Sequence, residues 1–340
     1  MSLRPVCLAA CLAIPSLAAA TPGAGLASIA QGYTVGDGIT RAGVTVFPVT
    51  AEGSPKLADD EQVIPFADAL QQGVLTVTEA GHDMQVASLR VHNRGKDPVL
   101  VMAGEIVEGG QQDRVITQDI LVPPSDRPIA LTVNCVERSR WSGGSSFSYG
   151  GQAEMGLRRV VQVRRNQDAT WEAVSDINGR KASLVQALGY DSMALRSSGG
   201  TYMASLESGV LERQVAKTAQ ELHQELSKEG DVVGIVVAVG GRVVGSDVFG
   251  APEVWQRVSE STLAAVARDA MTAHVSASFI QAPEQQVAAD FLVRALDGYV
   301  STSGVRGIAN HTVVETSEAR SYVLADADGD LLHMASYALD

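Results

Sequence analysis

A proline-rich interruption at Pro123–Pro128, with the sequence Pro-Pro-Ser-Asp-Arg-Pro, constrains the fold more than any other feature of the chain. Three prolines in six residues can continue neither a helix nor the interior of a strand. Runs rich in β-branched residues lie on both sides, at Arg114–Val122 and Ile129–Val136. The simplest structure for this pattern is an antiparallel pair of strands joined by a short loop.

The alternation of side chains along a strand predicts which residues meet across this hairpin. If Val122 pairs near Pro128, then Arg114 falls near Val136 and Glu137. A guanidinium and a carboxylate would then lie together at the open end of an apolar surface, where leaving either unpaired is costly. We therefore expect Arg114 and Glu137 to form a pair at a rim that solvent reaches.

Other polar side chains gather at the same end of the predicted hairpin. Glu105 and Glu137 are candidates for an acid–base pair, because two carboxyl groups in different surroundings can differ in pKa. An arginine fork beside an indole suits an anion that carries a flat ring. The candidate ligand-binding residues are Gln112, Arg114, Arg138, Arg140 and Trp141. A buried ion-pair network that fixes the hairpin register would explain the same cluster without a ligand.

Cys135 lies within the second predicted strand and allows two interpretations. It could be a catalytic thiolate, but the neighbouring sequence supplies no histidine to act as its base. Its position beside Val133 and Leu131 favours a small buried hydrophobic residue. Cleavage of the export signal described below would leave Cys135 as the single cysteine, so no disulfide within the chain is expected.

The motifs around this cluster resemble a bacterial protein family. They are GE-x-V-x-GG-x-QDR from Gly104, VPPS from Val122 and CVE-x-x-RW from Cys135, with FADALQQG and GIVVAVGGRVVGSDVF elsewhere. Together they resemble the ARG and rhodanese-phosphatase-superfamily-associated protein domain, in which ARG stands for ADP-ribosylglycohydrolase. The family often has lysine where this chain has Gln111, so a role that needs a cation there does not carry over. The resemblance implies no established activity, only an association with enzymes of ADP-ribose and phosphate chemistry.

The rest of the chain predicts an α+β fold. We expect antiparallel β-hairpins or sheets in an N-terminal and a C-terminal part, with a layer of amphipathic helices. The expected strands are 39–50, 74–79, 86–93, 99–102, 232–239, 242–249, 312–315, 321–325 and 331–337. The expected helices are a short one from 65, then 168–188, 205–228, 252–271 and 283–296. Ser142–Gly151 is expected to be a flexible connection, and Asp326–Asp330 a hairpin turn rather than a calcium loop.

The N-terminus has the pattern of an export signal. Arg4 is followed by an apolar run over Pro5–Leu17, and Ala18–Ala20 offers small residues for cleavage before Thr21. Because Pro5 and Pro15 interrupt this apolar run, we do not expect it to form a membrane-spanning helix. We expect a periplasmic or secreted protein, with lipidation at Cys11 as the lesser alternative. The expected parts are residues 1–20 as signal, 21–38 as leader, 39–165 as a β-rich part with the polar motif, and 166–340 as an α+β part. Whether the last two form one domain is left open.

Composition and motifs narrow the function. The net charge of −13 argues against nucleic acid or an anionic membrane as partner. No metal or nucleotide-cofactor motif is present, so we expect no cofactor. We expect the site to bind a small anionic ligand like a nucleotide, ADP-ribose or a sugar phosphate, and hydrolysis is compatible with its carboxyl pair. Two alternatives stay open: a non-catalytic cell-envelope protein acting through protein contacts, and a thiol enzyme that uses Cys135.

Overall fold

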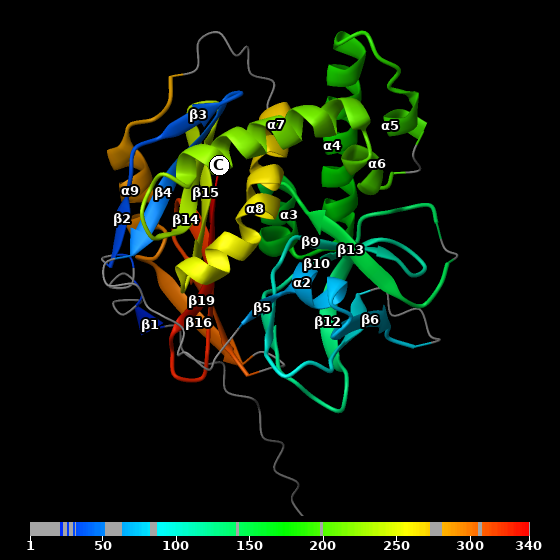
Figure 1. Ribbon diagram of the computed structural model, residues 1–340, viewed down its shortest axis with the longest axis horizontal. Coiled ribbons are helices and arrows are strands. Elements are labelled where there is room, and N and C mark those ends of the chain that lie inside the picture. Colours follow the sequence, from blue (N-terminus) through cyan, green and yellow to red (C-terminus); the bar gives the residue numbers. More distant parts are fainter. Residues whose placement is uncertain are drawn as a thin grey trace, which may run out of the picture.

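The computed structural model confirms an α+β fold built on antiparallel sheets. It describes residues 21–22, 26, 30, 32–51, 63–81, 87–140, 143–197, 200–272, 281–304 and 308–339. The expected export signal, Cys11 and Trp141 lie outside these residues. Figure 1 shows a large sheet on the left and a smaller β part at the lower right, with helix α3 (Met155–Arg164) near the centre and α4 (Gln167–Ala187) at the upper right.

The large sheet has ten strands and combines both ends of the chain. Its order is β1 (Thr21–Pro22), β16 (Tyr299–Gly304), β17 (Asn310–Glu315), β18 (Ala319–Ala325), β19 (Leu331–Ala338), β15 (Arg242–Phe249), β14 (Val232–Val239), β4 (Val44–Ala51) and β2 (Tyr33–Val35), with β3 (Ile39–Arg41) also on β4. The predicted hairpin of β14 and β15 and the predicted strands β17, β18 and β19 are confirmed. Because β2, β3 and β4 pair into the C-terminal sheet, the sheets do not divide at residue 165 as the sequence suggested.

Side chains of β14 show how helices cover both faces of this sheet. Ile235 and Val237 pack in one core with residues of α7 (Gly209–Leu226) and α8 (Pro252–Thr272). Val236 and Ala238 point to the opposite face, where residues of α9 (Gln285–Arg294) cover them. This alternation explains why the strand is apolar along its whole length. In the described residues, no helix is long and apolar enough to cross a membrane.

The smaller β part contains two further sheets. Six strands run in the order β13 (Phe147–Gln152), β9 (Glu105–Gly109), β10 (Arg114–Ile116), β12 (Ile129–Cys135), β7 (Ser88–Asn93) and β6 (Leu75–Glu79). Three more run in the order β11 (Ile120–Val122), β8 (Val99–Val101) and β5 (Ile64–Pro65), which leads into helix α2 (Phe66–Gln71). The edge strands β6 and β13 meet through a bridge between Thr78 and Ser146, so the six-stranded sheet curls toward a barrel.

The hairpin predicted around Pro123–Pro128 is wrong in its first strand. Only β10 pairs with β12, with Arg114 opposite Cys135, whereas β11 crosses to β8 in another sheet. The strand divides before Asp119, whose buried carboxylate accepts a hydrogen bond of 2.7 Å from the amide of Ala103. Ionised side chains in the interior need such partners, so the chain bends to bring Asp119 to them.

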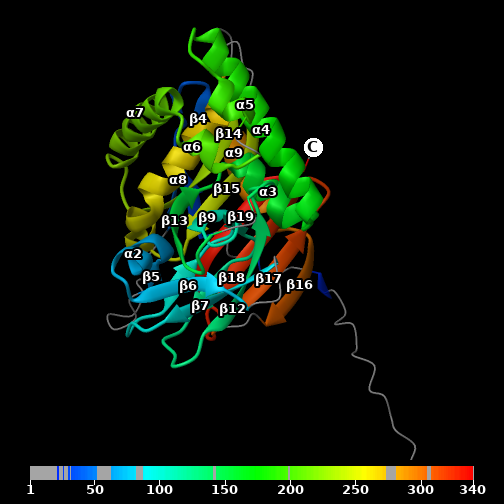
Figure 2. The same cartoon turned by 90° about the vertical axis from the view of Figure 1, so that its right-hand side faces the viewer.

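The expected flexible connection at Ser142–Gly151 is also wrong for its second half, which forms β13. This strand pairs with β9, and the bulge beside Gly151, with φ of +116°, lets it keep register with a shorter partner. The strand then leads directly into α3. Figure 2 shows α3 and α4 above the six-stranded sheet, and α3 lies between the two β parts, where Arg159 donates a hydrogen bond to the carbonyl of Ala338 on β19.

Candidate functional site

The predicted pair of Arg114 and Glu137 does not form. The Arg114 guanidinium is buried, with Nη1 donating to the carbonyl of Gln112 and Nη2 lying 3.9 Å from Oε1 of Glu79. Glu79 comes from β6, on the far side of the curled sheet, and its position could not be read from the hairpin. The expected solvent-reachable rim at Arg114 is therefore wrong, because this side chain is 1% exposed.

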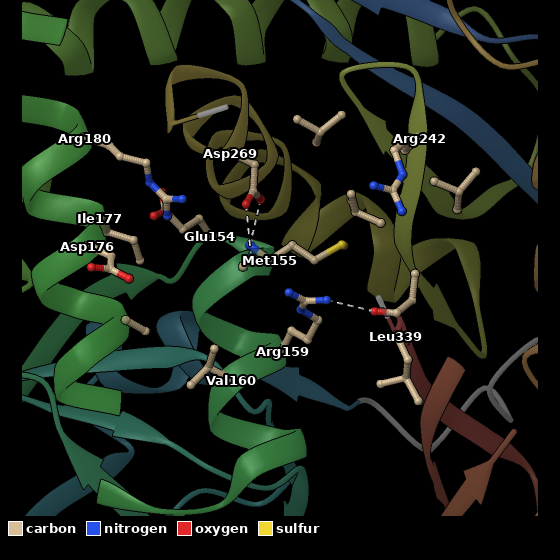
Figure 3. A pocket seen from close by; sticks show the side chains of 16 residues that line it. Glu154, Met155, Arg159, Val160, Asp176, Ile177, Arg180, Arg242, Asp269 and Leu339 are labelled. Carbon is tan, nitrogen blue, oxygen red and sulfur yellow. Dashed lines mark hydrogen bonds between the residues drawn. The ribbon is translucent and has the colours of Figure 1, made fainter. Parts of the chain in front are cut away.

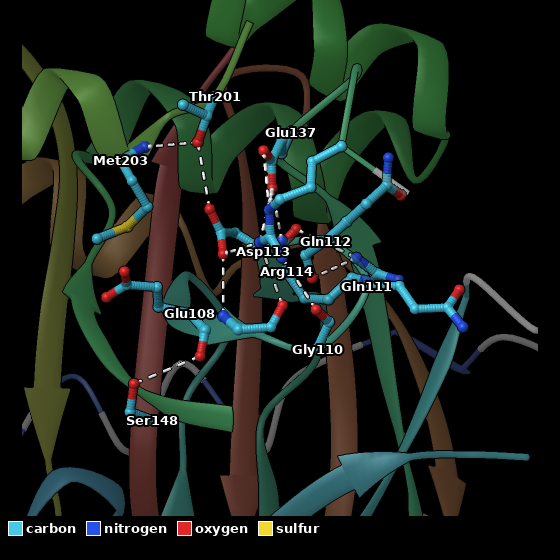
Figure 4. A network of polar contacts seen from close by, with 12 residues as sticks. Glu108, Gly110, Gln111, Gln112, Asp113, Arg114, Glu137, Ser148, Thr201 and Met203 are labelled. Carbon is cyan, nitrogen blue, oxygen red and sulfur yellow. Dashed lines mark hydrogen bonds and ion pairs between the residues drawn. The ribbon is translucent and has the colours of Figure 1, made fainter. Parts of the chain in front are cut away.

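Glu137 pairs instead with Arg140. The Nε of Arg140 donates to both Glu137 oxygens at 3.1 and 2.9 Å, and its Nη2 lies 2.8 Å from Oδ1 of Asp113. Asp113 also accepts from the hydroxyl of Thr201 at 3.3 Å, as Figure 4 shows. These contacts connect the turn after β9 to the segment after β12, as expected of a structural network.

The other candidate ligand-binding residues lie in different surroundings. Gln112 is fully buried, and its amide nitrogen and oxygen have no hydrogen-bond partner among the described residues. Arg138 is exposed and its guanidinium carbon lies 5.3 Å from the ring centroid of Trp171 on α4, a cation–π distance. The structure thus brings Gln112, Arg114, Glu137 and Arg140 into one cluster, whereas Arg138 points to a neighbouring helix.

Glu105 belongs to a second, fully buried network and not to an acid–base pair with Glu137. One Glu105 oxygen accepts a hydrogen bond of 2.7 Å from the amide of Met102. Burial raises the pKa of Glu105 to about 8, with the nearby charge of Asp119 adding to the rise. This location of Glu105 could not be predicted from the sequence, because the charges that surround it come from distant segments.

The centre of this second network is His333 on β19. Its Nδ1 lies 2.6 Å from Asp119, and its Nε2 lies 3.2 Å from Asp247 on β15. Arg158 on α3 donates two hydrogen bonds to Asp247, at 2.7 and 2.5 Å. Burial opposes the charge on His333, but the two carboxylates outweigh it and raise the pKa of His333 to about 9. The network joins the two β parts of the molecule, and sequence reasoning missed every member except Glu105.

Cys135 is buried in β12. Its backbone amide and carbonyl both bond to the side chain of Gln167 at 2.8 Å. Burial raises the pKa of the Cys135 thiol, which disfavours the thiolate that a nucleophile needs. These surroundings favour the interpretation of Cys135 as a small core residue.

A pocket of about 440 Å³ lies elsewhere, between α3, α4, α8, the β14–β15 turn and the end of β19. This volume is in the range of small-molecule sites. Its lining alternates apolar side chains with charged ones, and the charged ones are Glu154, Arg159, Asp176, Arg180, Arg242 and Asp269. Figure 3 shows Arg180 and Arg242 on opposite sides, with Asp269 between them.

Asp269 sits at the start of α3. Its two oxygens accept hydrogen bonds from the amides of Met155, at 2.7 Å, and Gly156, at 3.0 Å. A helix N-terminus normally stabilises a carboxylate. Burial dominates here, and together with the charge of Glu154 it raises the pKa of Asp269 to about 7.

Glu154, which precedes α3, is the second carboxyl group of this pocket. It is 1% exposed, and one of its oxygens lies 3.2 Å from Nζ of buried Lys181. Neither Glu154 oxygen has a hydrogen bond within the described residues. A carboxyl group so placed keeps unused capacity to accept hydrogen bonds.

The arginines of the pocket differ in how they are held. Arg159 donates to the carbonyl of Ala338 at 3.2 Å. Arg180 and Arg242 are exposed, and in the described part of the chain neither makes a hydrogen bond or ion pair. Two guanidinium groups are therefore available on opposite walls of one cavity. No group of three histidine, cysteine, aspartate or glutamate side chains in the described ranges is arranged to hold a metal ion.

Comparison with known proteins gives one match. The family model described as ARG and Rhodanese-Phosphatase-superfamily-associated Protein domain matches residues 32–337, which include the smaller β part, most of the large sheet and all lining residues of the pocket except Ala338 and Leu339. No curated protein and no solved structure matches the chain.

Proposed function

The chain belongs to the ARG and Rhodanese-Phosphatase-superfamily-associated Protein family, and we propose that it binds a small anionic ligand in the pocket between α3, α4 and α8. The ligand class is that of nucleotides, ADP-ribose or sugar phosphates. The observation that carries the proposal is the pair of arginines, Arg180 and Arg242, that line this pocket without a protein partner among the described residues. Guanidinium groups suit phosphate and carboxylate oxygens.

The charge of the lining supports an anion. Three arginines line the pocket against three carboxyl groups, but Lys181 offsets Glu154. Asp269 is only partly ionised near neutral pH, since its pKa is about 7. The pocket thus carries a positive surplus within a chain whose net charge is −13, and such a contrast attracts anions.

The cluster predicted from sequence offers less to a ligand. The charges of Arg114 and Arg140 already face Glu79, Asp113 and Glu137. A ligand would have to displace these partners, at the cost of leaving buried carboxylates unpaired. If this protein is a hydrolase, we accordingly propose Asp269 as its general acid, in place of Glu105 or Glu137.

A thermal-shift screen of nucleotides, ADP-ribose and sugar phosphates tests the proposal. We expect at least one of these compounds to raise the melting temperature of the wild-type protein. Arg180→Ala and Arg242→Ala should reduce the shift, whereas Arg213→Ala, which removes an exposed arginine on α7, should keep it. No shift with any compound would refute the proposal and favour a non-catalytic protein that works through protein contacts.

We also propose that the protein is exported, on the strength of the N-terminal pattern at Arg4–Ala20. N-terminal sequencing of the protein from the producing cells should begin at Thr21. A protein that keeps Met1 or Ser2 would contradict export by this signal.

A further inference from the structure

We infer that Asp269 helps to select the ligand: in the complex its carboxyl group is protonated and donates a hydrogen bond to an oxygen of the ligand. Arg180 and Arg242 bind the negative charge of the same oxyanion. The inference rests on the proposed function and adds two properties to it. The ligand must present an oxyanion, such as phosphate or carboxylate, and its binding must take up a proton from solvent.

The position of Asp269 supports this role. It lies between the two arginines in Figure 3, and its oxygens are fixed by the amides of Met155 and Gly156. A protonated carboxyl group can accept these two hydrogen bonds and still donate its own proton to a ligand oxygen. The group that meets the ligand is therefore held by a helix and not by a loop, which limits the freedom it would lose on binding.

Glu154 makes the protonated form accessible. Its carboxyl group lines the same pocket, where it lies 3.2 Å from Nζ of Lys181 and close enough to Asp269 to influence its charge. Two carboxyl groups in one site disfavour double ionisation, so one of them retains a proton more readily. The pKa of Asp269, raised to about 7 by burial and by Glu154, agrees with this arrangement.

An arriving anion shifts this balance further. It adds negative charge beside Asp269, and like charges in a desolvated site favour protonation of the carboxyl group. The charged and titratable groups around Asp269 are Glu154 and Arg159 of the α3 segment, Asp176, Arg180 and Lys181 of α4, Arg242 of β15, Arg268 beside it on α8, and Tyr202. Arginines keep their charge, and burial raises the pKa of Tyr202 well above its usual value, so the arginines and Tyr202 keep their protonation states near neutral pH.

Calorimetric titration with ADP-ribose tests the inference. A phosphate monoester titrates near pH 6, whereas the diester pyrophosphate of ADP-ribose keeps its charge near neutral pH. We expect the dissociation constant to rise roughly tenfold per pH unit above about pH 7, the limit for one linked proton. Titrations in two buffers of different ionisation enthalpy should show uptake of about one proton at the alkaline end.

Two variants separate the role of Asp269 from that of its neighbours. Asp269→Asn keeps one oxygen for one of the two α3 amides, loses the hydrogen bond from the other, and offers the ligand a donor that does not titrate, so its affinity should no longer depend on pH. Asp176→Asn changes another carboxyl group of the same pocket and should retain the pH dependence. Wild-type binding without proton uptake would overturn the inference and leave the proposed function intact. Absence of ADP-ribose binding at every pH would overturn the inference, and the proposed function would fall with it only if no compound of the thermal-shift screen binds either.

Discussion

Replacing Arg158 with methionine should strongly destabilise the protein, because it removes one member of a buried ion pair. Arg158 and Asp247 are each 1% exposed, and two hydrogen bonds of 2.7 and 2.5 Å join them. Without the guanidinium, Asp247 keeps, among the side chains that the structure describes, only the contact with His333, at 3.2 Å. Loss of one partner from a buried pair costs about 3–5 kcal/mol. At roughly 2 °C per kcal/mol for a large domain, the melting temperature should fall by about 6–10 °C.

Urea unfolding followed by circular dichroism measures this cost. Arg257→Met provides the control, since it breaks an arginine–aspartate pair with Asp68 in which both side chains are about one-third exposed. Such exposed pairs contribute less than about 1 kcal/mol. Asp247→Asn should rescue part of the loss in Arg158→Met, because it removes the unpaired charge. A loss for Arg158→Met no larger than that for Arg257→Met would refute the account of this network.

Three further predictions concern the buried residues. Gly104→Ala should cost about 2–3 kcal/mol in urea unfolding, because at φ of +92° its Cβ would lie 2.3 Å from Cγ of Arg158; Gly73→Ala, with φ of +70° and open space around it, should cost less. The pKa of His333 is raised from 6.5 to about 9. Its contribution to stability is therefore complete below about pH 6.5 and is lost as the pH rises through about 9, at up to about 1.4 kcal/mol per pH unit. A free energy of unfolding that increases between these pH values would contradict this prediction. Cys135 should react with iodoacetamide only slowly until the protein is unfolded, whereas rapid labelling of the folded protein would revive the thiol enzyme.

Elements whose signal is local could be predicted from the sequence. The β14–β15 hairpin is an example: Gly240 and Gly241 supply the two positive φ angles, +61° and +78°, that a tight turn between strands requires. The apolar spacing along α7 likewise matched the buried face that it presents. In both cases the residues that decide the structure are neighbours in the chain.

The division between β10 and β11 could not be predicted, because it depends on contacts that are distant in sequence. The strand ends before Asp119, whose carboxylate accepts a hydrogen bond from the amide of Ala103 and contacts the ring of His333. His333 lies 214 positions further along the chain. A pattern of β-branched residues continues through this point and predicts one strand. The partners of the buried carboxylate, and not the strand propensity, determine the path.

The candidate site was missed for a related reason. Glu154, Arg180, Arg242 and Asp269 come from four different elements and have no common spacing. The charged residues around Arg114 and Arg140 do cluster in the structure, but both arginines are paired with carboxylates of the protein itself. A dense run of charged residues signals a network of ion pairs, and only the fold shows whether any of its charges is left for a ligand.

A crystal structure of the protein with ADP-ribose tests the central claim most directly. The account predicts pyrophosphate density between Arg180 and Arg242, with one oxygen in hydrogen-bond contact with Asp269. Density beside Arg138 or Arg140, with the pocket between α3, α4 and α8 left to solvent, would contradict it.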